Sequence, residues 1–268
     1  MNTDSDKGIN WIEFIPKNQR EEEIKNKLLT AERIGESLVQ KFLSTLLERK
    51  GLWVKSPVNL WKLIGRYKTP LDVLNRYNHP LQPDIDILCA KFKNNPKTPL
   101  FGFEVKLFSR FKQIVIPKTA ENKGYYTGIE QTLSLLTYGL DYATLWHVFL
   151  VPLEKWEERE DVDQIISENV EWAACYAQFI EHFIKDLHLP IGYKATALSI
   201  RRNQGKIMYL DFYEVSAPLQ CIFASTPAKI RVLLTEKLKI EETIYQKQFL
   251  DELIRMHGEN RISKQHSL

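Results

Sequence analysis

Apolar residues recur along this chain at two periods, and the periods predict the order of its helices and strands. From Asn18 to Lys50 the apolar positions return every three or four residues, as on the buried face of an amphipathic helix. Basic residues and then Gly51 end this stretch, which is typical of a helix terminus. One helix, or two broken near Thr30, would fit the pattern equally well. Residues 1–16 lack the pattern and are expected to form a loose lead-in.

Shorter apolar runs after this helical region predict strands. Residues 52–58 read as a first strand, and residues 59–82 as a short helical insertion. Two further strands are expected at Asp84–Ala90 and Leu100–Lys106, separated by residues rich in turn formers. Because the connection is short and polar, we expect these two strands to be adjacent and antiparallel.

Strand alternation gathers charged side chains at this pair of strands. Successive side chains point to opposite faces, so Asp84 and Asp86 are expected to share one face. The opposite face would carry Ile85, Ile87 and Cys89. In the next strand Glu104 and Lys106 point the same way. Two carboxylates and an amine gathered at a sheet are costly unless they bind a metal or take part in chemistry.

The pattern continues with a helix and a strand. Tyr126–Asp141 has helical spacing, and Tyr142–Val151 reads as a buried strand. A longer helix is expected at Ile165–Leu187. Its aromatic residues are spaced to pack inward, namely Trp172, Tyr176, Phe179 and Phe183.

The last third predicts a hairpin and a final helical region. Lys194–Arg201 and Lys206–Val215 alternate like strands around the turn signal Asn203–Gly205. Pro227–His257 reads as helical. Since no linker divides the chain, we expect a core at 1–152, including the 59–82 insertion, and a packed α/β extension at 153–268. That extension could continue the sheet, form a homodimer surface or carry a specificity module.

The charged motif resembles that of the PD-(D/E)xK nuclease superfamily. The matching residues are Pro83-Asp84-Ile85-Asp86, followed by Glu104-Val105-Lys106. The Gly35-Glu36 pair before an apolar helix resembles the archaeal Holliday junction resolvase and RecB-like branches. The resemblance implies an α/β (α+β) fold of restriction endonuclease-like type. This fold is a mixed β-sheet flanked by helices in the order α-β-β-β-α-β, here with a C-terminal helix–hairpin–helix extension.

The same resemblance implies roles for the motif residues. Asp86 and Glu104 would hold Mg²⁺ or Mn²⁺, hard cations that take oxygen ligands, and Glu36 would complete the metal site. Asp84 remains a candidate ligand beside Asp86, which is the preferred one. Lys106 would orient or help deprotonate the attacking water and contact the phosphate. Several branches carry a glutamine on the helix after the E-x-K strand, so Gln131 is a candidate active-site residue.

Composition restricts where a nucleic acid would bind. The formal net charge is only +3, so any basic surface must be local. Lysines and arginines near the motif in sequence are candidates for phosphate contacts. They are Lys91, Lys93, Arg110, Lys112, Lys118 and Lys123.

Other sequence features bear on location. Three widely spaced cysteines fit neither a disulfide framework nor a zinc site, and no apolar run has the length of a membrane span. The first residues are polar and do not resemble a signal peptide. We therefore expect a cytoplasmic protein that does not enter a membrane.

The function expected from these observations is metal-dependent hydrolysis of DNA phosphodiester bonds. Two alternatives stay open: a nuclease-fold module that binds DNA or a partner with little catalysis, and a nuclease that acts on RNA. The presence of all three motif residue types argues against a decayed site.

Overall fold

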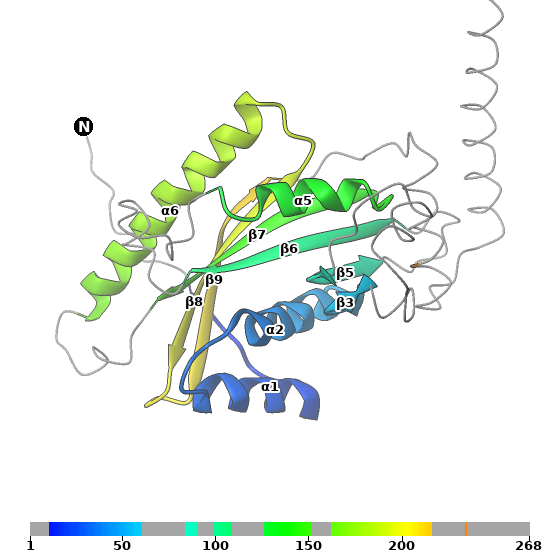
Figure 1. Cartoon of the computed structure of the whole chain (residues 1–268). Coiled ribbons are helices and arrows are strands. Elements are labelled where there is room, and N and C mark those ends of the chain that lie inside the picture. Colours follow the sequence, from blue (N-terminus) through cyan, green and yellow to red (C-terminus); the bar gives the residue numbers. More distant parts are fainter. Residues whose placement is uncertain are drawn as a thin grey trace, which may run out of the picture.

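The computed structural model describes residues 11–60, 84–90, 99–108, 126–151 and 162–215, together with Leu234. Within these residues the chain forms a mixed α+β structure, a curled sheet flanked by helices (Figure 1). The fold class is therefore mixed, as the sequence predicts.

Seven strands form the main sheet, in the order β1-β9-β8-β7-β6-β5-β2. Their bounds are β1 Ile12–Glu13, β2 Trp53–Lys55, β5 Ile87–Ala90, β6 Leu100–Phe108, β7 Tyr142–Val151, β8 Gly192–Arg201 and β9 Lys206–Val215. The central strands β6, β7 and β8 are parallel to one another, and every other neighbouring pair is antiparallel. A separate two-stranded sheet pairs β3 (Val58–Asn59) with β4 (Asp84–Ile85).

Helices cover both faces of the sheet. The helices α1 (Gln19–Thr30) and α2 (Glu36–Arg49) lie on one side, and α5 (Ile129–Leu136) and α6 (Val162–Asp186) lie on the other (Figure 1). Each side has its own hydrophobic core, one built around α1 and α2 and the other around α5 and α6. Residues of one strand alternate between the two cores because the sheet is covered on both faces.

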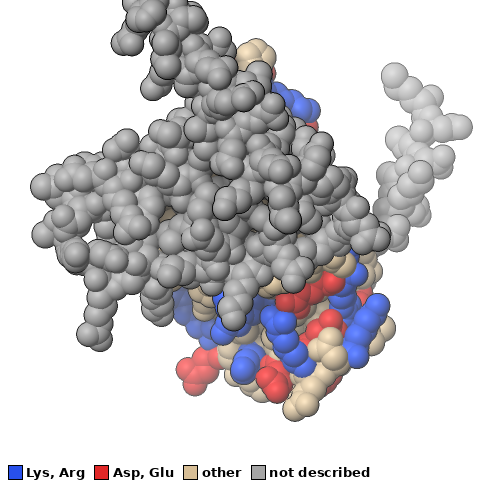
Figure 2. Space-filling view, turned by 90° about the vertical axis from the view of Figure 1, so that its right-hand side faces the viewer, with Lys and Arg blue, Asp and Glu red and all other residues tan. Residues whose placement is uncertain are grey.

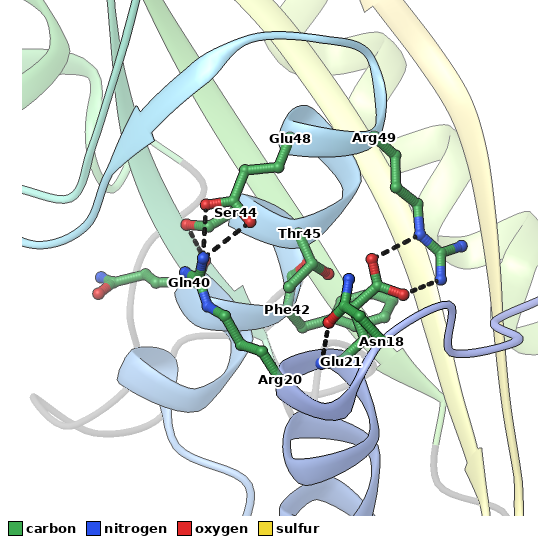
Figure 3. A network of polar contacts seen from close by, with 9 residues as sticks. All are labelled: Asn18, Arg20, Glu21, Gln40, Phe42, Ser44, Thr45, Glu48 and Arg49. Carbon is green, nitrogen blue, oxygen red and sulfur yellow. Dashed lines mark hydrogen bonds and ion pairs between the residues drawn. The ribbon is translucent and has the colours of Figure 1, made fainter.

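The helical region 18–50 is two helices, and polar contacts fix α2 against α1. Asn18 caps α1, and the chain leaves helical geometry at Ala31 before α2 begins. Arg49 near the end of α2 binds the Glu21 carboxylate through two hydrogen bonds, of 2.6 and 3.1 Å (Figure 3). These hydrogen bonds lower the pKa of Glu21, so the ion pair persists in mildly acidic solution. The clamp holds the helix whose first residue is Glu36.

Several predicted elements are confirmed. β5 and β6 are adjacent and antiparallel, β7 spans Tyr142–Val151, and β8 and β9 form the predicted hairpin. Of the roles left open for the second half, its strands extend the sheet, because β8 pairs with β7 over eight residue pairs. The final helical region at Pro227–His257 lies outside the described residues except for Leu234, and so do residues 61–82 of the predicted insertion.

Three expectations are wrong. The lead-in is not wholly irregular, since Ile12–Glu13 pairs with β9. Two of the α6 aromatics do not pack inward: Trp172 is 46% exposed and Phe179 is 72% exposed. Spacing alone identified an aromatic stripe, but the stripe is wider than the face of α6 that the sheet covers.

The third error concerns the face shared by three buried residues. Ile87 and Cys89 pack in the core of α1 and α2, whereas Ile85 packs in the core of α5 and α6. The regular alternation is broken because the strand is interrupted at Asp86, between β4 and β5. Asp84 and Asp86 therefore do not lie on one continuous strand.

Candidate active site

The candidate site lies where the sheet divides. At Asp86 the chain bends, so that β5 stays in the main sheet beside β6 while β4 pairs with β3 instead. The β5–β6 pairing ends at Ile87 opposite Phe103, yet β6 continues to Phe108. The second half of β6 is paired with β7 along one edge, and no other described strand pairs with its second edge. Its backbone amides on the other edge need acceptors from elsewhere.

Two carboxylates meet this open edge of β6. Asp86 Oδ2 accepts a hydrogen bond of 2.7 Å from the Val105 backbone N–H. Glu36 Oε2 approaches the Leu107 N–H at 3.4 Å, a long hydrogen bond. Amides two residues apart point to the same side of a strand, so both carboxylates take the place that β5 would have filled. Asp86 arrives from the bend before β5, and Glu36 from the start of α2.

Lys106 lies between these groups. Its ammonium is 2.6 Å from Glu104 Oε1 and 3.8 Å from Glu36 Oε1. The prediction that Glu104 and Lys106 share a face is confirmed by this ion pair. Both residues are buried, with Glu104 4% and Lys106 8% exposed. One buried ammonium thus faces three nearby carboxylates, an arrangement with surplus negative charge.

Burial, together with the surplus negative charge, changes the protonation of the carboxyl groups. Burial, and then repulsion by Asp86, raise the pKa of Glu104 to about 7. Burial likewise raises the pKa of Asp86, although the Val105 hydrogen bond and Lys106 oppose that shift. For Lys106, burial alone would lower the pKa, but the hydrogen bond and charge of Glu104, aided by Glu36, raise it. Lys106 is therefore protonated at neutral pH, whereas Glu104 is only partly protonated at that pH.

The remaining predicted residues lie around this cluster. Asp84 is exposed, and its Oδ1 accepts a 2.7 Å hydrogen bond from the Asn59 side chain, so it faces β3. Gln131 is half-buried on α5. Within the described chain, its side chain takes no part in the hydrogen bonds and ion pairs that join the cluster. The structure thus brings together Glu36, Asp86, Glu104 and Lys106. Within the described chain, Asp84 and Gln131 take no part in the hydrogen bonds and ion pairs that join those four residues to one another or to β6.

The six cations predicted to contact phosphates all lie outside the described residues. They are Lys91, Lys93, Arg110, Lys112, Lys118 and Lys123. On the described lower part of the face in Figure 2, Lys and Arg lie among Asp and Glu. Exposed charges of both signs also occur along α1. The described part of that face therefore carries mixed charge.

The carboxylates match a hard divalent cation in the kind and charge of their oxygens, but not in their arrangement in this structure. Glu36, Asp86 and Glu104 supply carboxylate oxygens, the ligands that Mg²⁺ and Mn²⁺ prefer, and their surplus charge favours a further cation. Among the residues that the structure describes, no group of three or more His, Cys, Asp and Glu is arranged to hold a metal ion. One Glu104 oxygen and one Asp86 oxygen are engaged by Lys106 and the Val105 amide.

Sequence reasoning missed two residues beside Lys106. Gly128, just before α5, lies against the Lys106 side chain, and His147 on β7 is the residue paired with Lys106 across β6 and β7. His147 is completely buried. A glycine ahead of an apolar helix and a histidine inside an apolar strand were the available signals.

Comparison with protein families, curated proteins and solved structures finds no match to this chain. No helix in the described ranges is both long and apolar enough to cross a membrane.

Proposed function

We propose that this protein is a metal-dependent nuclease of PD-(D/E)xK type that hydrolyses DNA phosphodiester bonds. The observation that carries the proposal is the convergence of Glu36, Asp86, Glu104 and Lys106 at the open edge of β6. These residues come from three separate segments of the chain. A buried cluster of this composition is costly for folding, and such clusters are concentrated at functional sites.

The order of elements supports the same proposal. Among the described elements, the main-sheet strands and the helices that cover them follow from α2 onward as α2, β2, β5, β6, α5 and β7, with the separate β3–β4 pair between β2 and β5. This is the order α-β-β-β-α-β that the resemblance implies, with the acidic bend and the E-x-K strand at its second and third strands. The restriction endonuclease-like fold is accordingly part of the proposal.

The protonation states suggest how these residues would act. Lys106 carries its proton at neutral pH, so it can donate hydrogen bonds to a phosphate oxygen or to the attacking water. Glu104, with its pKa of about 7, can hold or release a proton at pH values near neutrality. The backbone amides of Val105 and Leu107 orient the Asp86 and Glu36 carboxylates.

Asp86, Glu104 and Glu36 would hold Mg²⁺ or Mn²⁺. When bound, the cation would activate water and offset the charge that develops on the phosphate. The chain's own contribution is the position of the charges. Lys106 neutralises part of the carboxylate charge, and its buried location keeps its ammonium directed at the site.

A nicking assay tests the proposal. Supercoiled plasmid and labelled single-stranded RNA are incubated with the protein in Mg²⁺ or Mn²⁺, and in EDTA. We expect nicked and linear plasmid only when the cation is present. Glu104→Gln should abolish cutting, whereas Glu181→Gln should not, because Glu181 belongs to an exposed helical ion pair with Lys185 far from the motif in sequence.

Each other outcome has a defined meaning. Cleavage of RNA but not plasmid would identify an RNA nuclease. If neither is cut, yet plasmid is retarded in a gel, the protein is a binding module. If Glu104→Gln cuts as fast as the parent protein, the assigned residues are not the active site.

A further inference from the structure

The Lys106 side chain is held from two sides. Its ammonium is fixed by Glu104 and Glu36, as described above. Its aliphatic part lies against the backbone of Gly128. A Cβ atom placed on Gly128 would be 3.0 Å from Lys106 Cγ, 3.3 Å from Lys106 Cε and 2.6 Å from Leu145 Cδ1. Contacts this close leave no room for a side chain on residue 128, so this glycine allows the turn to press on the lysine.

The backbone conformation of Gly128 belongs to the same arrangement. Its φ of +94° lies in the left-handed region that glycine tolerates and other residues disfavour. The carbonyl of Gly128 then accepts hydrogen bonds from Thr132, 2.8 Å from its backbone N–H and 2.7 Å from its hydroxyl. These bonds make Gly128, the residue that lies against Lys106, part of the first turn of α5.

His147 ties this turn to the sheet. Its Nε2 lies 3.1 Å from the carbonyl oxygen of Thr127, the residue before Gly128. Because a carbonyl can only accept, Nε2 carries the proton and donates. In the neutral ring Nδ1 then accepts from the Tyr193 hydroxyl of β8, at 3.2 Å. His147 is also the β7 partner of Lys106 in the parallel register.

We infer that Gly128 and His147 together position the Lys106 side chain for the proposed cleavage reaction, an inference that rests on that proposed function. His147 fixes the turn through Thr127, and the turn presses Gly128 onto the aliphatic part of Lys106. Both are positioning residues, because Gly128 touches only the aliphatic part of Lys106 and His147 acts through the Thr127 carbonyl. Small displacements of an active-site group lower the rate steeply, so the position of the ammonium matters.

Gly128→Ala is the direct test, with Gly205→Ala as its matched control. Gly205 also has a positive φ, of +61°, but a Cβ there would meet nothing within 4 Å. Both variants strain the backbone, and only the first crowds the side chains of Leu145 and Lys106. We expect Gly128→Ala to lower kcat for plasmid nicking about tenfold or more, while KM and Mg²⁺ affinity change less than about twofold.

A spectroscopic readout does not depend on cleavage. The ¹⁵Nζ signal of Lys106, assigned by its loss in Lys106→Arg, should shift in Gly128→Ala and stay fixed in Gly205→Ala. Lys194 provides an internal reference, since it is a second buried lysine with its own partner, Asp211, at 2.7 Å. Its signal should not move in either variant.

His147 is tested by a pair of substitutions. His147→Gln keeps an N–H that can reach the Thr127 carbonyl, and His147→Leu does not. We expect His147→Leu to shift the Lys106 signal and to lower kcat about tenfold, with His147→Gln restoring most of the loss. This pair keeps the inference testable if Gly128→Ala fails to fold.

The inference is overturned if Gly128→Ala matches Gly205→Ala in both kcat and the Lys106 signal. It is also overturned if His147→Leu and His147→Gln behave alike. Should the parent protein cut no nucleic acid, the proposed function fails, and the Lys106 signal still decides whether these two residues position the lysine.

Discussion

At the scale of single residues, the decisive feature is a buried charge cluster with unequal signs. Glu104 and Lys106 form a close ion pair, but Asp86 and Glu36 add negative charge that the lysine does not offset. Removing ions from water costs several kcal/mol each unless good partners replace it, so such a cluster does not favour stability. Its consequences should therefore appear in the rate of cleavage and in the pH dependence of the protein's stability.

Lys106→Ala should cut slowly while still binding the cation. The carboxylates remain, so Mg²⁺ affinity at pH 8 should change little, whereas kcat should fall about a hundredfold because a hydrogen-bond donor to the reacting phosphate is lost. Calorimetric titration with Mg²⁺ and single-turnover cleavage of a labelled duplex measure the two effects. Lys185→Ala, at an exposed lysine, serves as control. Cleavage at the parental rate would remove Lys106 from the active site.

The pKa of Glu104 predicts a pH-dependent stability in EDTA. Its ordinary pKa is 4.5 and its folded value is about 7, so the folded chain binds the proton more tightly. This contribution to stability is complete below pH 4.5 and is lost as the pH rises through 7, by about 3 kcal/mol at most. Asp86 acts in the same direction.

Urea denaturation between pH 5 and 8 tests this expectation. Glu104→Gln has no carboxyl to titrate, so its stability should fall less with rising pH than that of the parent protein. Glu181→Gln should keep the parental slope. Equal slopes for the parent and Glu104→Gln would show that Glu104 titrates normally.

At the scale of elements, the site depends on where strands stop pairing. β5 begins at Ile87, so its pairing with β6 stops opposite Phe103 while β6 runs on to Phe108. The start of α2 meets the edge of β6 that no other described strand covers. The clamp between Arg49 and Glu21 fixes α2 at its other end. A helix start directed at a strand edge can present a carboxylate there, and the helix dipole favours negative charge at that position.

Glu36→Gln tests this contribution of α2. The substitution keeps the side chain's size and removes its charge, so we expect weaker Mg²⁺ binding and about tenfold slower cleavage. Glu32→Gln, in the exposed connection before α2, is the control and should match the parent protein. If Glu36→Gln leaves both properties unchanged, Glu36 does not serve the cation, and its contacts with Leu107 and Lys106 are structural.

At the scale of the whole molecule, the two halves of the sequence share one sheet. β7 pairs with β8 from Thr144 opposite Gly192 to Val151 opposite Ser199. The core of α5 and α6 likewise contains side chains from both halves. The proposed active site therefore belongs to a sheet that residues 1–152 do not complete.

A chain ending at residue 152 should accordingly fail to fold. It would expose one edge of β7 and buried residues such as Leu145 and Phe149. Thermal unfolding followed by circular dichroism should lack the cooperative transition that the full chain shows. A sharp transition in the shortened chain would instead establish an autonomous core.

The sequence by itself determined the local features of this protein. The period of two in β6 placed Glu104 and Lys106 on one face, and turn residues marked the β8–β9 hairpin, because these relations hold between close neighbours in the chain. Helical spacing likewise indicated α1, α2 and α6, although it left open whether the first two were one helix or two broken near Thr30, where α1 ends.

Only the tertiary structure decided how distant segments meet. Glu36 reaches Leu107 across 71 positions, and the bend at Asp86 sends Ile85 and Ile87 into different cores. His147 interrupts an apolar strand in the sequence, yet in the fold it fixes the turn that lies against Lys106. The physical reason is that pairing of strands and helices far apart in sequence is set by packing of the whole sheet, which local periodicity does not encode.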